Sequence, residues 1–354
     1  MRIALIAPPF IAVPPKRYGG TELFISQLAE GLKTLGVDVV VYANGESTVD
    51  VEVRSIYKTS HWPIQGEVYA NLMDLNHTSW AIRDAWSDCD VIHINNVPGL
   101  SFSRFAGPRF LYTVHHPHEK TLSEFYSHYT DVQFVTISEF QQSYETMPHM
   151  RTIHHGVDLR QYEYKAKKQN YFSFLGRIAP LKGTHLAIEV ARRTGIPLKI
   201  AGEVQPCFRD YFDTQVSPYI DGKLVEFVGE ADLATKNELL GNSMAMLFPI
   251  QWNEPFGLVM IEAMATGTPV VALPGGAVNE VVCDGVSGLL CRSVDQMIAR
   301  IPELEKLSPA RIRNYVEKKF SVERMVRDYF DLYSEMLEQP TSSIAEPEEP
   351  RAVA

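Results

Sequence analysis

The chain has 354 residues, more than one ordinary hydrophobic core holds, and this length predicts two domains of about 150 residues each. Its 33 basic and 43 acidic side chains give a net charge of −10, which argues against a protein that binds nucleic acid by neutralising phosphates. An anionic small-molecule ligand stays open, because a few local cations suffice for a diphosphate.

The cysteines and the apolar segments indicate in which cellular compartment the protein is expected. The cysteines, four in number, are scattered without CxxC spacing, which is typical of reduced thiols in a cytoplasmic protein. Pro8 and Pro9 break the apolar N-terminus, and no small-residue cleavage site follows, so this segment predicts a first core strand rather than a signal peptide. No apolar run reaches 18 residues, and no membrane-spanning helix is expected.

The first half of the chain alternates apolar strands with an amphipathic helix. A strand over residues 3–7 is followed by a long loop to Gly20 and by a helix that stops before Gly36. Strand, helix and strand in this order form a βαβ unit, and hence a parallel sheet. The other strands expected in this sheet are residues 37–43, 90–94, 109–114 and 132–137.

A polar stretch at residues 156–170 lacks apolar periodicity and predicts a linker, with a domain boundary near residue 160. A second α/β run follows, so the chain should form two facing Rossmann-like domains, residues 1–160 and 161–321. An amphipathic helix over residues 322–338 comes next, and the acidic, Pro- and Ser-rich residues 339–354 are expected to be disordered. The second sheet is expected to contain residues 171–176, 197–202, 224–229, 245–250 and 268–273, with a helix at 183–194.

The stretch WNEPFGLVMIEA places two glutamates around the start of a helix expected over residues 256–266. The free amides of Phe256, Gly257 and Leu258 would form an anion site at that helix N-terminus. Glu254 precedes the helix. The simpler explanation of this residue is that its negative charge stabilises the positive end of the helix dipole. Glu262 lies among apolar neighbours, where a carboxylate is costly without a partner. Amides flanked by two carboxylates suit a diphosphate with a sugar at each end, which is a nucleotide sugar.

The stretch LGRIAPLKG places Arg177 at the end of a strand and Lys182 before a helix. Ligands of open α/β sheets bind at this carboxyl end of the strands. Two cations here suit a diphosphate and would stabilise charge on a leaving group. An arginine and a lysine that merely flank a solvated loop are an equally good explanation of this motif alone.

Together, GRIAPLKG and EPFGLVMIE resemble family 4 of the retaining glycosyltransferases, which has the GT-B fold. Its most specific signature is the Glu-x7-Glu spacing of Glu254 and Glu262, and further matching segments are RYGGTE, YTVHH, HGVD and GGAVNEVVCDGVSGLL. The resemblance covers nearly the whole chain. It implies two Rossmann-like domains with a cleft between them and a C-terminal helix that crosses back to the first domain.

The resemblance also implies roles for the residues of the second domain. It places Glu254 on the transferred hexose and Glu262 on the nucleotide ribose. It places Arg177 and Lys182 on the diphosphate. Glu280 resembles a position near the donor site, although a helix-surface acid explains it nearly as well.

In the first domain, the resemblance places Gly19 and Gly20 at the donor phosphates, although a tight turn alone would also need such glycines. It places His115 beside the transferred sugar, as a catalytic residue together with Glu254, Arg177 and Lys182. His116 stands where the family usually has Asp and is an acceptor-side candidate, as is Ser138.

Two further histidines have less defined roles. His118 is expected at the surface or in contact with the acceptor, and His155 replaces a usual Asn near the interdomain hinge. No histidine has further ligands at metal-binding spacing, so no metal site is predicted.

The sequence therefore predicts a retaining, metal-independent glycosyltransferase without a cofactor, which moves a hexosyl group from a nucleotide-diphosphate sugar to a hydroxyl acceptor. A UDP-hexose is favoured slightly over a GDP- or ADP-sugar. A GT-B phosphorylase, a nucleotide-sugar epimerase and a non-catalytic sugar-nucleotide-binding protein stay open as alternatives. A cytoplasmic location is expected, with peripheral membrane contact left open, and the oligomeric state and the acceptor are not determined by the sequence.

Overall fold

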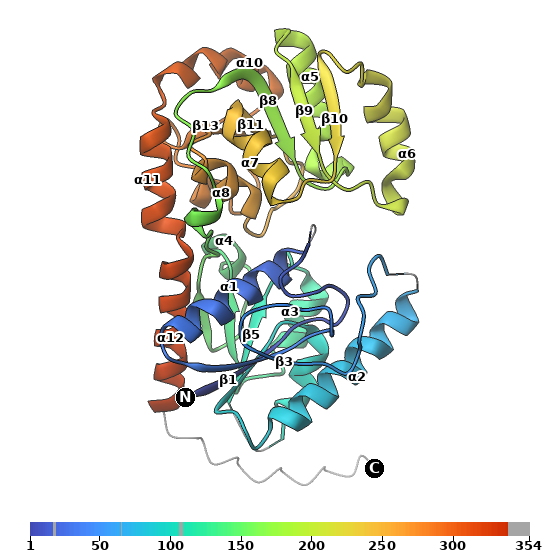
Figure 1. Ribbon diagram of the computed structural model, residues 1–354, viewed down its shortest axis with the longest axis vertical. Helices are drawn as coiled ribbons and strands as arrows, with labels where there is room; N and C mark the ends of the chain where they lie inside the picture. Colours follow the sequence, from blue (N-terminus) through green and yellow to red (C-terminus); the bar gives the residue numbers. More distant parts are fainter. Residues whose placement is uncertain (17–18, 65, 106–108, 339–354) are drawn as a thin grey trace, which may run out of the picture.

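The computed structural model describes residues 1–16, 19–64, 66–105 and 109–338. These residues form two α/β units, one above the other (Figure 1). The last two helices, α11 (Pro309–Phe320) and α12 (Val322–Glu338), run in succession along one side, α11 beside the C-terminal unit and α12 beside the N-terminal unit. Each unit contains a parallel sheet with hydrophobic clusters that pack on it, so the expected two-domain α/β fold is confirmed. The tail predicted to be disordered, residues 339–354, lies outside the described residues.

The N-terminal sheet has seven parallel strands in the order β3-β2-β1-β4-β5-β6-β7. Their bounds are β1 Arg2–Ile6, β2 Asp38–Tyr42, β3 Glu52–Arg54, β4 Val91–Ile94, β5 Arg109–Val114, β6 Gln133–Thr136 and β7 Met150–Thr152. The five inner strands match the five predicted runs, because strands covered on both faces are apolar throughout. The edge strands β3 and β7 were not predicted, since each has three residues and is partly exposed.

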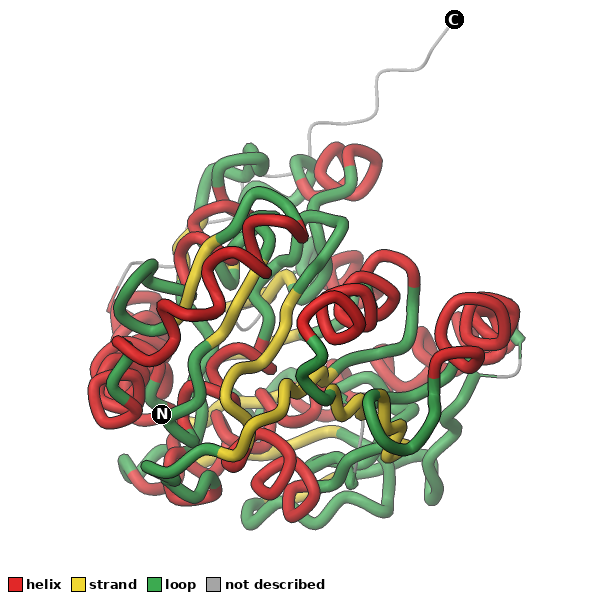
Figure 2. Tube along the Cα trace, turned by 90° about the horizontal axis from the view of Figure 1, so that it is seen from above, coloured by secondary structure: helices red, strands yellow, loops and turns green. Residues whose placement is uncertain are grey.

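Helices cover both faces of this sheet, and Figure 2 shows them on either side of the strands. Their bounds are α1 Gly20–Thr34, α2 Glu67–Ala85, α3 Lys120–Tyr126 and α4 Glu139–Gln142. The apolar stripe of α1, with Phe24 and Leu28, packs on the sheet and on the C-terminal helix α12 (Val322–Glu338). An added Cβ at Gly31 would overlap the Val326 side chain, so this glycine sets how closely α1 and α12 approach.

The C-terminal sheet has six parallel strands in the order β10-β9-β8-β11-β12-β13. The strands are β8 Gln169–Leu175, β9 Leu198–Ala201, β10 Val225–Gly229, β11 Ser243–Phe248, β12 Val270–Ala272 and β13 Gly288–Leu290. The helices are α5 Thr184–Thr194, α6 Arg209–Tyr211, α7 Leu233–Asn242, α8 Leu258–Ala265, α9 Val278–Val281, α10 Val294–Arg300 and α11 Pro309–Phe320. Five of the six strands match the predicted runs, and the short edge strand β13 was not predicted.

Helix α8 begins two residues later than predicted. Its N-cap is Gly257, whose φ of 87° and ψ of 64° are left-handed, so the helix cannot continue back to Phe256. Glu262 is therefore one turn into the helix, not two, and Glu254 lies four residues before it. This shift brings Glu262 closer to the helix N-terminus and places Glu254 farther from it, so that each lies four residues from Leu258.

Helix α12 is joined to the N-terminal sheet by a buried polar network. His93 on β4 is hydrogen-bonded through Nδ1 to the Tyr333 hydroxyl at 2.7 Å and through Nε2 to Thr113 Oγ1 at 2.8 Å. Thr113 is in turn 2.9 Å from the Tyr329 hydroxyl. Burial lowers the pKa of His93 to about 3, so its ring is neutral and both nitrogens serve the network.

Candidate functional site

A cleft of about 1350 Å³ lies between the two domains. It is walled on one side by α1 and the ends of N-terminal strands, and on the other by the loop before α8 and the loop after β8. Its lining contains most of the predicted site residues: Gly19, Gly20, His115, His116, Arg177, Lys182, Glu254, Phe256, Gly257, Leu258 and Glu262. The topology thus brings together residues that lie up to 243 positions apart in the sequence, from 19 to 262.

Ser138 is the predicted site residue that does not line this cleft. It is fully buried at the N-cap of α4, where its hydroxyl accepts a hydrogen bond from the Gln141 amide at 3.0 Å. A serine before a short helix commonly caps it, and that role occupies the side chain here. The structure therefore gives Ser138 a structural position in place of the expected acceptor contact.

Glu254 is held in the loop after β11 by two donors to one oxygen. Its Oε2 accepts hydrogen bonds from Lys182 Nζ at 2.5 Å and from Trp252 Nε1 at 2.9 Å. Lys182 Nζ also lies 4.7 Å from the centre of the Trp252 ring. Among the described residues, no group donates to Glu254 Oε1, so one carboxylate oxygen is left for a ligand.

The sequence reasoning missed Trp252. The signal was present, because a tryptophan near a carboxylate in a cleft needs an acceptor for its indole N–H. Lys182 was expected on a diphosphate, but its ammonium is ion-paired with Glu254 in this structure. Arg177 differs from Lys182: no carboxylate of the described residues lies within ion-pair distance, and its guanidinium makes only a 3.4 Å contact with Gln205 Oε1.

Glu262 is buried near the middle of α8 and has partners for one oxygen. Oε1 accepts hydrogen bonds from the Tyr162 hydroxyl and Lys236 Nζ, both at 2.8 Å. Burial and the Glu262 charge hold the pKa of Tyr162 well above its usual range. Oε2 is also buried, but no described residue donates to it. This second carboxylate therefore repeats the arrangement of Glu254, with one satisfied and one unsatisfied oxygen.

Two helix N-termini face each other across the cleft. Gly20 begins α1, and a Cβ at this position would lie 3.5 Å from Leu258 Cδ1 at the start of α8. The first amides of a helix have no partners within it and carry partial positive charge. Since Phe256 lies outside α8 and is buried, the amides that begin the helix are those of Leu258 and Val259. The cleft between the helix ends is thus suited to an anion.

His115 follows β5 and packs in a stack of rings. Its ring lies 5.7 Å from the His155 ring at 6°, and His155 in turn meets Phe256 edge-on at 5.2 Å. Asn95 Nδ2 donates to the Ile6 carbonyl at 3.1 Å, so its Oδ1, 2.9 Å from His115 Nε2, accepts the ring proton. This assignment leaves Nδ1 of His115 as an acceptor.

The stacked histidines are uncharged. Burial, with the neighbouring His155, His93 and His116, holds the pKa of His115 well below its usual range. Burial first, and then Arg324 and His154, lower the pKa of His155 to about 3. Neither ring supplies a positive charge to the cleft at neutral pH. Asn95, which sets the His115 tautomer, was not singled out from the sequence, because it lies on a different strand end.

The other two histidines of this segment are held by the N-terminal domain. His116 Nδ1 donates to the Pro117 carbonyl at 2.9 Å, and Nε2 accepts from the Tyr126 hydroxyl at 2.5 Å. His118 Nδ1 lies 3.0 Å from Oε1 of the buried Glu145. Of the two, His116 lines the cleft.

Glu280 lies at the junction of the domains. Its carboxylate accepts hydrogen bonds from the amides of Glu139 and Phe140, at 2.9 and 2.6 Å, and is 3.0 Å from His154 Nε2. These donors belong to α4 and to the segment that leads out of the N-terminal domain. In this structure the contacts of Glu280 are with the N-terminal domain and with His154, which the sequence did not predict.

The described part of the chain contains neither a candidate metal site nor a helix that could span a membrane. No group of three or more His, Cys, Asp and Glu residues is arranged to hold a metal ion there. No helix in these ranges is long and apolar enough to cross a membrane.

Two family models match the chain in succession. Glycosyltransferase Family 4 matches residues 18–161, and Glycosyl transferases group 1 matches residues 158–319. The chain is 30% identical over 322 residues to the phosphatidyl-myo-inositol mannosyltransferase of Mycolicibacterium smegmatis, covering 82% of this chain and 80% of that one. It is also 33% identical over 152 residues to the glycogen synthase of Mycobacterium tuberculosis, and here it spans only 36% of the relative's length.

Solved structures share the fold. The sucrose-phosphate synthase (tll1590) from Thermosynechococcus elongatus has a TM-score of 0.78 at 19% identity, with 95% of this chain and 98% of that chain covered. Anabaena Alr3699/HepE in complex with UDP-glucose has a TM-score of 0.75 at 16% identity, with coverages of 95% and 100%.

Proposed function

Because the chain belongs to glycosyltransferase family 4, we propose that it transfers a hexosyl group from a nucleoside-diphosphate sugar to a hydroxyl acceptor. The observation that carries this proposal is that the carboxylates of Glu254 and Glu262 are held in the same way. Each carboxylate is buried, each is held through one oxygen, and each keeps a second oxygen without a donor among the described residues. Carboxylate oxygens are acceptors for sugar hydroxyls.

The donor would lie along the cleft in a defined order. Glu254 would bind hydroxyls of the hexose, the N-termini of α1 and α8 would bind the diphosphate, and Glu262 would bind the ribose. Lys182 would contribute less positive charge to the diphosphate, because its ammonium is already ion-paired with Glu254. Arg177, which has no carboxylate partner among the described residues, is the better candidate for the phosphate charge.

The chemistry would proceed with retention of configuration, as in the family that the chain belongs to. The bond from the anomeric carbon to the diphosphate breaks, and the acceptor oxygen bonds to that carbon on the same face. The acceptor proton passes to the departing diphosphate. Arg177 and the helix amides stabilise the charge on the leaving group without a metal ion, a contribution of several kcal/mol in such sites, roughly 3 for one donor.

His115 would act as a neutral acceptor beside the sugar. Its Nε2 proton is directed to Asn95, so the lone pair on Nδ1 is free to take a hydrogen bond from a hexose hydroxyl. A charged imidazolium is not needed in this role, in keeping with the low pKa that burial gives His115. A UDP-hexose is the donor we favour, because Alr3699/HepE, which shares the fold, is known in complex with UDP-glucose.

The test is an assay of nucleoside diphosphate release from UDP-, GDP- and ADP-sugars, with and without EDTA. We expect EDTA-insensitive release from one donor, lost at least 100-fold in Glu254→Gln and Arg177→Ala. The matched control is Glu305→Gln, which removes an exposed carboxylate on the surface of the C-terminal domain. Analysis of the sugar product would reveal an epimerase, and phosphate-dependent turnover would reveal a phosphorylase. Donor binding without turnover under any condition would favour the non-catalytic alternative, and full activity in both variants would contradict the site.

A further inference from the structure

Helix α1 presents two polar side chains to the cleft, and neither takes part in the donor contacts proposed above. Ser26 and Gln27 have exposed fractions of 4% and 8%, and both line the cleft. Neither side chain has a hydrogen-bonding partner among the described residues. The Gln27 carboxamide therefore keeps its donors and its acceptor for a group in the cleft. Of the two side chains, Gln27 can offer a ligand the larger number of hydrogen bonds.

The position of Gln27 is fixed relative to the two helix N-termini. Gly20 and Leu258 meet where α1 and α8 begin, at the level expected for phosphates. Gln27 lies about 10 Å further along α1, and Glu262 about 6 Å further along α8, at a rise of about 1.5 Å per residue. Both side chains line the cleft, Gln27 from α1 and Glu262 from α8.

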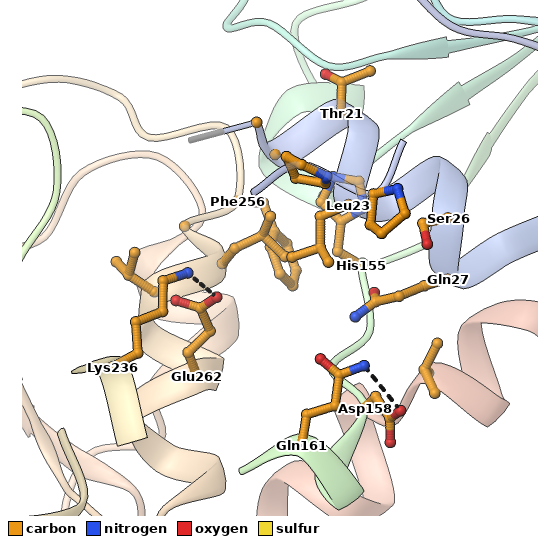
Figure 3. Close-up of a pocket in the computed structure, with 18 of the residues that line it drawn as sticks. Thr21, Leu23, Ser26, Gln27, His155, Asp158, Gln161, Lys236, Phe256 and Glu262 are labelled. Carbon is orange, nitrogen blue, oxygen red and sulfur yellow. Dashed lines mark hydrogen bonds and ion pairs between the residues drawn. The ribbon is translucent and has the colours of Figure 1, made fainter. Parts of the chain in front are cut away.

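Figure 3 shows the side chains at this level. Gln27 extends from α1 into the cleft above Gln161 and below Leu23, and Glu262 lies on the opposite wall. The polar groups around it are already engaged: Lys236 is paired with Glu262, and the Gln161 amide donates to Asp158 Oδ2 at 3.3 Å. The Gln27 carboxamide has no partner among the described residues on one wall, and neither has Glu262 Oε2 on the other. Within the same described ranges, Ser26 and Nδ1 of His155 are also without partners in this part of the cleft.

A ligand that satisfies both walls must donate to a carboxylate and exchange hydrogen bonds with a carboxamide. A ribose edge with two neighbouring hydroxyls does both, since each hydroxyl donates one hydrogen bond and accepts others. We propose that Gln27 is a binding residue for the ribose of the donor nucleotide, so that the ribose is held between Gln27 of one domain and Glu262 of the other. This inference rests on the proposed function and adds to it a contact from the N-terminal domain.

The consequence is a coupling between donor binding and the domain arrangement. All other ribose contacts expected for this chain come from the C-terminal domain, with Glu262 in α8. A contact from α1 is made only while the domains face each other as they do here. Nucleotide affinity therefore depends on a residue that never touches the C-terminal sheet.

The experiment compares Gln27→Met with the wild type by calorimetric titration. Methionine keeps the length and packing of the side chain and removes its hydrogen-bonding groups. The ligands are the nucleoside diphosphate chosen by the donor screen and its 2′-deoxy and 3′-deoxy forms. Ser26→Ala, which removes the neighbouring unpartnered hydroxyl, is the matched control. Thermal unfolding of each variant reports whether it folds.

We expect Gln27→Met to raise the Kd of the nucleoside diphosphate about tenfold. We also expect the wild-type preference for the ribose over at least one deoxyribose to shrink in this variant, which lost packing alone would not cause. Ser26→Ala should change the Kd less than twofold. Wild-type Kd and wild-type ribose preference in Gln27→Met would overturn this inference and leave the proposed function standing. A wild-type protein that binds no nucleoside diphosphate would overturn both.

Discussion

At the scale of single residues, the Glu254 carboxylate divides its oxygens between the protein and the cleft. Oε2 accepts from Lys182 and from the Trp252 indole, and Oε1 has no donor among the described residues. A carboxylate fixed in this way has little rotational freedom left, so its free oxygen points in one direction before any ligand arrives. Trp252 and Lys182 thus together orient the proposed hexose contact.

We expect Trp252→Phe to lower kcat about tenfold while donor affinity changes less than threefold. Phenylalanine keeps a smaller aromatic face beside Lys182 and removes the N–H donor, a loss of about 0.5–1.5 kcal/mol for that hydrogen bond. Steady-state kinetics and donor titration on the same preparation separate the two effects. An equal loss in kcat and in affinity would mean that the ring forms the binding surface itself.

Buried histidines should make the stability of the protein depend on pH. The pKa of His155 is lowered to about 3 in the folded chain, against an ordinary value of about 6.5. Above pH 6.5 the ring is neutral in both states and has no effect. Below it, the unfolded chain binds a proton that the folded chain refuses until about pH 3, so stability falls as the pH falls through this window.

Replacing His155 should flatten that dependence. Between pH 7.5 and 5.5, we expect the free energy of unfolding of His155→Asn to fall by about 1 kcal/mol less than that of the wild type. Denaturant titrations at the two pH values measure the difference. His149→Asn, at an exposed position, serves as the control and should follow the wild type. A wild-type slope in His155→Asn would show that this ring is protonated in the folded protein.

At the scale of elements, the apolar periods of the sequence predicted the inner strands, α1, α5 and α12. They did not predict β3, β7 and β13, because three-residue edge strands have too few side chains to show a period. The start of α8 was placed two residues early, since the left-handed conformation of Gly257 is imposed by the loop around Glu254. The partners of site residues, such as Asn95 for His115, depend on tertiary contacts that one sequence does not contain.

The contact between α1 and α12 gives a prediction about packing. Gly31→Ala places a methyl group against Val326, and we expect the free energy of unfolding to fall by about 1–3 kcal/mol. Adding Val326→Ala makes room for the methyl group, so the double variant should be less destabilised than the sum of the single variants. Additive losses would mean that the helices move apart instead of clashing.

At the scale of the whole molecule, the cleft exists only because the domains are held at a junction. Glu280 of the C-terminal domain accepts hydrogen bonds from two amides at the start of α4 and pairs with His154. Arg324 of α12 donates to the carbonyls of His154 and His155, at 2.5 and 3.2 Å. The segment between the domains is thereby tied to both, next to the ring stack that contains His115.

Removing the Glu280 carboxylate should affect transfer more than donor binding. We expect Glu280→Ala to lower kcat about tenfold and to leave the Kd of the donor within threefold of the wild type, since most proposed donor contacts lie in the C-terminal domain. Glu280→Gln keeps one acceptor oxygen and should be intermediate. Kinetics beside calorimetry measures the split, and a Kd that rises as much as kcat falls would place Glu280 in the donor site itself.

The crossing of α12 has a consequence for the order in which the protein matures during its synthesis. The core beneath α1 contains Met325, Tyr329 and Tyr333, which the ribosome makes after the entire C-terminal domain. The first domain to emerge must therefore wait with part of its apolar surface uncovered, while the second can complete its own core. At about 5–20 residues per second, this wait lasts on the order of ten seconds or more. The domain that is made first is finished last.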